Sequence, residues 1–201
     1  MDTIAPVRGP GRPRRFDADV ALDRAVRVFS ERGYHATSIN DLAEAMELAQ
    51  GSIYKAFGDK RGVYIAALER YHTVRTQLLE EAAASGRTGR QKLRNALMFF
   101  ADSSFGEEGR RGCLVVGSAS ELAAFDDEAA AKVAAALVRK EKLMAGYLEE
   151  GIADGSVDPG TDAAAAARFM LCVVNGMRVT GKTGRSREEM ADVVELAMRA
   201  L

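Results

Sequence analysis

The residues that could carry catalysis or hold a metal ion are few in this sequence. It contains two cysteines, Cys113 and Cys172, and two histidines, His35 and His72, and no C-x-x-C or H-E-x-x-H spacing joins them. Such spacings are the usual sequence signs of zinc sites, so we expect no metal. Because paired acids, a nucleophile with a base and a glycine-rich phosphate loop are also missing, we expect neither an enzyme nor a cofactor.

The basic side chains are unevenly distributed. The formal net charge is −1, yet the first fifteen residues hold Arg8, Arg12, Arg14 and Arg15 against the single acid Asp2. Residues 1–15 therefore form a basic arm in front of a nearly neutral body. Such an arm is either an idle terminus or a segment that contacts a polyanion such as nucleic acid.

Helical periodicity governs the chain from residue 16 onward. Apolar residues recur at three- and four-residue spacing, as at Ala21, Ala25, Val28 and Phe29, and no period-2 pattern typical of strands appears. We therefore expect an all-α fold. The pattern predicts three short helices before residue 58, a long helix over 60–84, and further helices over 90–104, 112–125, 127–154, 161–180 and 187–201, with loops at 106–111 and 155–160.

The three short helices, with a tight turn between the second and third, predict a helix-turn-helix, whose last helix is narrow enough for the major groove of B-DNA. The sequence between Phe29 and Lys60 reads F-S-E-R-G-Y-H-A-T-S-I-N-D-L-A-E-A and, further on, G-S-I-Y-K-A-F-G-D-K. It resembles the N-terminal domain of the TetR-like family of bacterial repressors. The resemblance implies a helix-turn-helix domain over 16–62 and a larger helical domain over 63–201 that binds an effector and dimerises.

The resemblance implies contacts to the DNA backbone at four positions. Thr37, Ser38 and Tyr54 carry hydroxyls suited to phosphate oxygens. Lys60 is expected in the first turn of the long helix, where exposed amides and the helix dipole also favour a phosphate.

Base reading is expected on the exposed face of the third helix, at Gln50, Gly51, Ser52 and Lys55. A glutamine can bind adenine, a lysine can bind guanine, and a glycine permits close approach of the backbone.

The arm resembles a minor-groove binder, because Pro10-Gly11-Arg12-Pro13-Arg14 is similar to the core of an AT-hook. We expect Arg12 and Arg14 to contact the minor groove or phosphates.

Two residues of the helix-turn-helix depart from the family pattern. Glu47 stands where glycine is common in the turn, and Ala49 stands where a serine or threonine would cap the recognition helix. A non-glycine residue in a left-handed position costs roughly 1 kcal/mol, as does a missing cap, so we expect a softer turn.

The last two helices carry apolar stripes with small residues, which the resemblance implies form a four-helix dimer interface; internal packing is the alternative. A two-fold dimer would place two recognition helices about 34 Å apart, one turn of DNA. The predicted interface residues are Ala163, Ala167, Met170, Leu171, Val174, Met190, Val193, Val194, Ala197 and Leu201.

Aromatic and methionine side chains in the central helices are typical of a pocket for a small hydrophobic effector, although plain core packing explains them too. The effector-contact candidates are Met98, Phe105, Cys113, Tyr147 and Asn175.

Cys113 lies in R-G-C-L, similar to a G-C-L motif of one branch of the family. A thiol at a helix N-terminus beside Arg110 and Arg111 would have its thiolate favoured, so Cys113 is either a sensor thiol or an inert buried cysteine. Cys172 lies in an apolar stripe and is expected to be packed.

The function that these patterns indicate is a cytoplasmic, homodimeric repressor that leaves its operator when a small effector binds. Two alternatives remain open: a helical carrier or enzyme for an apolar ligand, and an activator or nucleoid protein that needs no effector. No apolar run has the roughly 20 residues that a membrane span needs.

Overall fold

The computed structural model describes residues 17–122, 124 and 126–201, so the basic arm, with Arg12 and Arg14, lies outside the described residues. Within that part the fold is all-α, as the periodicity predicted. The helices are α1 (Ala18–Arg32), α2 (Ile39–Met46), α3 (Gln50–Phe57), α4 (Lys60–Ala84), α5 (Gly89–Asp102), α6 (Gly106–Arg111), α7 (Leu114–Glu121), α8 (Asp127–Asp154), α9 (Ala163–Thr180), the 3₁₀ turn η1 (Gly181–Thr183) and α10 (Arg187–Met198).

Local sequence sets the ends of the N-terminal helices. The Asp17 carboxylate caps α1 by accepting hydrogen bonds from the amides of Asp19 and Val20. Gly33 ends α1 with a φ of +79°, which a glycine adopts at little cost. Ser38 and Asp41 form a capping box at the start of α2, which confirms the start predicted there.

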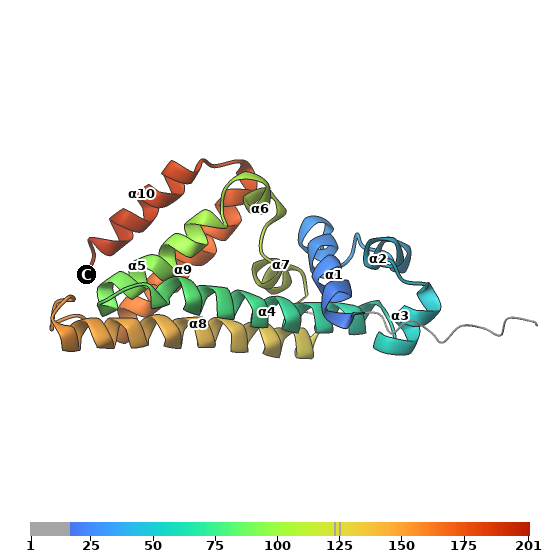
Figure 1. The fold of residues 1–201 in the computed structure, drawn as a ribbon, viewed down its shortest axis with the longest axis horizontal. Coiled ribbons are helices and arrows are strands. Elements are labelled where there is room, and N and C mark those ends of the chain that lie inside the picture. The colour runs from blue at the N-terminus through green and yellow to red at the C-terminus, as the bar shows by residue number, and fades with distance from the viewer. Residues whose placement is uncertain (1–16, 123, 125) are drawn as a thin grey trace, which may run out of the picture.

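The helices form an elongated molecule in which α1, α2 and α3 gather at one end of the long helix α4 (Figure 1). At the other end, α5 and α9 pack against the long helices, and α10 packs against α5 and α9. The two long helices run side by side and belong to both parts (Figure 1). The two long helices therefore connect the two ends of the molecule.

Two apolar cores lie along this axis. The first joins α1, α2 and α3 to the start of α4, with Phe29, Leu42 and Ile53 almost fully buried, and it continues into α7 and the beginning of α8. The second lies between α4, α5, α8, α9 and α10, with Leu97 and Met144 near its centre. Because α7 packs into the first core, the helix-turn-helix rests directly on the larger part of the chain.

The structure differs from the predicted elements around residue 112. The segment predicted as a loop over 106–111 is the short helix α6, and the helix predicted over 112–125 is α7, which ends at Glu121. Gly112 has a φ of +90° and separates the two. Acids in the first turn of α6 and arginines in its last turn complement the helix dipole, which favours a helix without an apolar stripe.

In the described part of the chain, none of the helices combines the length and the apolar character that crossing a membrane requires.

Candidate nucleic-acid interface and the contacts behind it

Helix α3 is anchored by one side and offers the other to solvent. Ile53 is fully buried against the first core. A side chain at Gly51 would meet nothing within 4 Å, so the helix backbone is open to a close approach there. The exposed residues of this face include Gln50, Gly51, Ser52, Tyr54 and Lys55, the outward set that the sequence predicted.

Gln50 is held in place across the turn. Its Nε2 donates a hydrogen bond of 2.5 Å to Oδ1 of Asn40 on α2. Asn40 is exposed beside it, and sequence reasoning missed this residue. A polar residue on the exposed side of α2, facing the start of α3, was the available signal. The pair fixes the side chain that we predicted would read a base.

The turn between α2 and α3 has the geometry expected from its two unusual residues. Glu47 adopts the left-handed conformation with a φ of +56°, and it is the sole non-glycine residue with positive φ in the described ranges. Ala49 caps α3 without any side-chain hydrogen bond. Arg24 of α1 fastens the turn, with Nη1 2.8 Å from the Glu47 carboxylate.

Two of the predicted phosphate contacts are exposed. Tyr54 is 49% exposed, so its hydroxyl is available to a ligand. The Ser38 side chain is also exposed, but its Oγ already donates to Asp41 Oδ2 at 2.6 Å and accepts from the Asp41 amide at 3.1 Å. These hydrogen bonds start α2 and hold the pKa of the Asp41 carboxyl below its usual value.

The other two residues predicted to contact phosphates make hydrogen bonds within the chain. Thr37 is only 2% exposed, and its hydroxyl donates to the Gly33 carbonyl at 2.6 Å. Lys60 Nζ donates to the carbonyls of Tyr34 and Thr37 at 2.9 and 3.0 Å and lies 4.2 Å from the centre of the Tyr34 ring. Lys60 therefore holds the α1–α2 connection in place, and its contact to a phosphate stays a prediction.

The same connection is clamped from the other side by α7. The Glu121 carboxylate, at the end of α7, accepts hydrogen bonds from the amides of Tyr34 at 3.1 Å and His35 at 2.8 Å. A Cβ atom on Gly33 would come within 2.7 Å of this carboxylate, so glycine is needed there. The buried hydroxyls of Tyr64 and Ser118 add a 2.6 Å hydrogen bond between α4 and α7.

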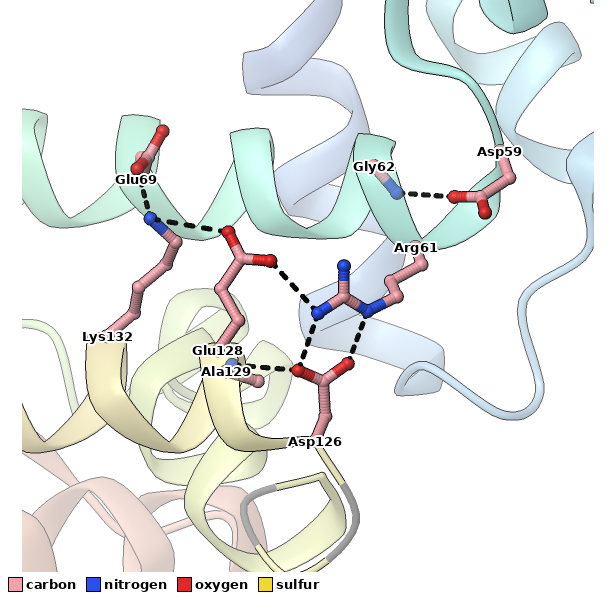
Figure 2. A network of polar contacts seen from close by, with 8 residues as sticks. All are labelled: Asp59, Arg61, Gly62, Glu69, Asp126, Glu128, Ala129 and Lys132. Atoms are coloured by element: carbon pink, nitrogen blue, oxygen red, sulfur yellow. Dashed lines mark hydrogen bonds and ion pairs between the residues drawn. The ribbon is translucent and has the colours of Figure 1, made fainter.

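A charged network joins the start of α4 to the start of α8 (Figure 2). The Arg61 guanidinium donates to both oxygens of Asp126, at 2.5 and 2.8 Å, and to Glu128 at 2.9 Å. Asp126 also caps α8 by accepting from the Ala129 amide. Chiefly because of the hydrogen bonds from Arg61, the pKa of Asp126 falls to about 2. Further along, Lys132 pairs with Glu69 and Glu128.

A small enclosed cavity lies between α4, α8 and α9, beside the start of α7. Of the five effector candidates, Cys113 alone lines it; the other side chains around it include Tyr71, Arg75, Lys140 and Arg178. The sequence did not single these residues out, since arginine and lysine on helices usually belong to solvated faces.

The other effector candidates lie elsewhere. Met98 and Tyr147 are partly buried against the second core, and Phe105 is the residue before α6. The side-chain oxygen of Asn175 is buried and has no hydrogen-bond partner.

The two cysteines differ from each other in their surroundings. Cys113 is buried at the N-cap of α7. Burial by itself would raise the pKa of its thiol, but nearby Lys140 and Arg178 and a hydrogen bond from Tyr71 bring this pKa below its usual value. Cys172 is exposed on α9. The expectation that it is packed is therefore wrong, because it lies on the side of α9 that faces away from the core.

Most residues predicted at a dimer interface pack inside the single chain. The apolar stripe of α9 faces α8, and that of α10 faces α5. A contact with a second copy must therefore use the opposite sides of these helices, where Phe169, Val179, Val193 and Leu196 are exposed. Of the predicted set, Val193 is exposed, Ala163 and Leu201 are partly exposed, and the buried members are Ala167, Met170, Leu171, Val174, Met190, Val194 and Ala197.

A helix-turn-helix with a solvent-facing polar third helix, mounted on a larger helical body, defines a DNA-binding transcriptional regulator. The chain belongs to the TetR family: residues 21–67 match the bacterial regulatory proteins of the tetR family, and residues 89–197 match the tetracyclin repressor-like C-terminal domain.

Similar proteins span most of the chain. The HTH-type transcriptional repressor ComR of Escherichia coli is 26% identical over 94% of this chain and 90% of its own length. The transcriptional regulator AcuR of Cereibacter sphaeroides is 29% identical over 78% and 75%. The structure of a cysteine mutant of the TetR family regulator CifR, complexed with 26-bp operator DNA, is similar with a TM-score of 0.81 and 34% identity over 94% of this chain and 99% of that one.

Proposed function

We propose that this regulator is a repressor that binds its operator as a homodimer and leaves it when a small molecule occupies the cavity beside Cys113. ComR is named a repressor, and the CifR mutant is bound to operator DNA, which supports operator binding by this chain. The site of action is the chromosome, and hence the cytoplasm. Gln50, Ser52, Tyr54 and Lys55 are the proposed contacts of α3 to DNA.

The observation that carries the proposal is the position of α7. At the N-terminal end of α7, Cys113 and Val115 line the cavity. At its C-terminal end, the Glu121 carboxylate accepts hydrogen bonds from the amides of Tyr34 and His35 in the helix-turn-helix. A helix of eight residues spans about 12 Å, so one short rigid element reaches from the cavity to the DNA-binding end.

Release follows if the effector binds better to a form in which α7 has moved. A ligand shifts an equilibrium only by its difference in affinity for the two forms. A shift of α7 would change the anchor at Glu121 and also the buried hydrogen bond between Tyr64 and Ser118. Effector and operator would therefore weaken each other's binding, and by the same factor.

The dimer is proposed to form through the exposed sides of α9 and α10. Phe169 and Val179 of α9 are 48% and 53% exposed, and Leu196 of α10 is 66% exposed. Large apolar side chains left this exposed on two neighbouring helices support an interaction surface there. A two-fold axis there would present two α3 helices to one face of a duplex.

A gel-shift titration against the DNA upstream of the chain's own gene tests the proposal. We expect a sequence-selective shift at nanomolar protein that weakens steeply with salt. Binding that ignores sequence would favour a nucleoid role, and a missing shift would favour a carrier of small ligands. A reporter fused to the same DNA, with and without the regulator's gene, distinguishes repression from activation.

A further inference from the structure

The cavity beside Cys113 is unusual in its charge. Three cationic side chains line it: Arg75 from α4, Lys140 from α8 and Arg178 from α9. No aspartate or glutamate is among its lining residues. Arg75 is paired with Glu108 at 2.8 Å, but Lys140 and Arg178 have no carboxylate within ion-pair distance in the described ranges. Buried cations normally have an anionic partner.

Arg178 is the most deeply placed of the three. It is 3% exposed, and its Nη2 donates to the Gly112 carbonyl at 2.6 Å. Its other terminal nitrogen, Nη1, is buried and has no hydrogen-bond partner. An unused N–H of a buried guanidinium is costly, and a carboxylate is the group whose geometry suits it best.

Lys140 also lacks an anionic partner, although it is only partly buried. Its ammonium lies 5.5 Å from the centre of the Phe100 ring, and within the described residues no carboxylate pairs with it. Burial, together with Arg75 and Arg178, lowers the pKa of Lys140, although Cys113 opposes the shift. Even if Cys113 carries a thiolate, one negative charge stands against two unpaired cations.

We propose that this cavity is the binding site of a small organic carboxylate, with its oxygens on Arg178 Nη1 and Lys140 Nζ. The apolar walls formed by Leu79, Phe100 and Val115 suit a short hydrocarbon part. The cavity has a free volume of about 20 Å³, little more than one water needs, so side chains around it must move to admit even acetate or propionate, and larger carboxylates are excluded. The inference rests on the proposed function and replaces the expected hydrophobic effector with a small anion.

Calorimetric titration of the full chain with propionate, without DNA, tests the proposal. We expect saturable binding, and none by propionamide, which has the same shape without the charge. Lys140→Met should weaken binding by at least about tenfold, because it removes one of the two partners of the carboxylate. The neighbouring exposed residue supplies a matched control, since Arg139→Met should bind propionate as the parent chain does.

Three results would overturn the proposal: no saturable binding up to about 10 mM propionate, equal binding of propionamide or chloride, or unchanged affinity in Lys140→Met. Lys140→Met removes an unpaired cation, so it should fold and melt at a higher temperature than the parent chain. Arg178→Lys keeps the charge but loses the planar fork, and it provides a second variant whose propionate affinity should fall. Since DNA is absent, failure here leaves the gel-shift result of the proposed function intact.

Discussion

Lys55 is an exposed cation on α3, and its side chain makes no ion pair within the described residues. If it contacts a base, Lys55→Ala should cost about 1–3 kcal/mol of operator affinity and relax the sequence preference at one position. Quantitative gel shifts with the operator and with variants of its sequence measure both the affinity and the sequence preference. Lys142→Ala removes the same charge from an exposed position on α8 and should leave affinity nearly unchanged. Equal losses in the two variants would contradict a specific contact.

Glu121 is the residue that ties α7 to the helix-turn-helix. Glu121→Gln leaves one oxygen to accept hydrogen bonds from two amides, so we expect a loss of about 1–2 kcal/mol in the free energy of unfolding. Amide hydrogen exchange at Tyr34 and His35, in the α1–α2 connection, should accelerate more than exchange within α1. Glu149→Gln, on an exposed part of α8, is the control. Unchanged exchange at both amides would show that the clamp does not hold the turn.

Single residues also show where sequence reasoning fails. The outward residues of α3 follow from local periodicity, because burial of Ile53 determines which side faces solvent. The contacts of Lys60 and Thr37 do not follow from periodicity, because their partners are carbonyls of the α1–α2 connection that only the folded chain brings near. Arg178 and Lys140 were missed for the same reason: three helices must pack before either is enclosed.

Among the elements, α3 begins without a side-chain cap. Ala49 already has the extended conformation of an N-cap residue, with φ −65° and ψ 142°. Ala49→Ser should therefore stabilise the chain by about 1 kcal/mol, measured by urea denaturation. Ala56→Ser, in the same helix but within its last turns, should instead cost a few tenths of a kcal/mol. A destabilised Ala49→Ser variant would contradict the helix start described here.

The junction of α4 and α8 should respond to acid through Asp126. Its folded pKa of about 2 lies below its usual value of 3.8, so its stabilising effect is present above pH 4 and is lost as the pH falls toward 2. Asp126→Asn retains a helix cap but does not titrate. Between pH 4 and 2 the parent chain should lose more stability than this variant, whereas Asp127→Asn should follow the parent. Parallel curves for the parent and Asp126→Asn would contradict the network in Figure 2.

The elements themselves were largely predictable. Amphipathic periodicity, Gly33 and the capping box of Ser38 gave the helices of the N-terminal part and their ends. Helix α6 was missed because G-E-E-G-R-R has no apolar stripe, and its stability depends on charges at its ends and on packing. The stripes of α9 and α10 were found, but periodicity cannot say whether a stripe faces the same chain or a second copy.

Operator binding through two α3 helices requires a symmetric pair of chains. Phe169→Glu places a charge in the exposed apolar side of α9, where a second copy should bury it. Light scattering after size exclusion should show a monomer, and operator affinity should fall with dimerisation. Val138→Glu alters an equally exposed apolar residue of α8 and should remain a dimer. If the Phe169→Glu variant elutes as the parent chain does, α9 is not part of the dimer interface.

The long helices α4 and α8 run along the length of the molecule (Figure 1). One end of α4 carries α3, and the cavity of Arg178 and Lys140 lies near the middle of both long helices, beside the start of α7. We propose that a ligand in this cavity changes the spacing of the two recognition helices through α7 and these long helices.

Hydroxyl-radical footprinting on the upstream DNA reports where both copies of α3 lie. A symmetric dimer should leave two protected patches on one face of the duplex, with centres about 34 Å apart, and Lys55→Ala should weaken both. A single continuous patch, protection without preference for sequence, or two patches that Lys55→Ala leaves unchanged would contradict operator binding by such a dimer.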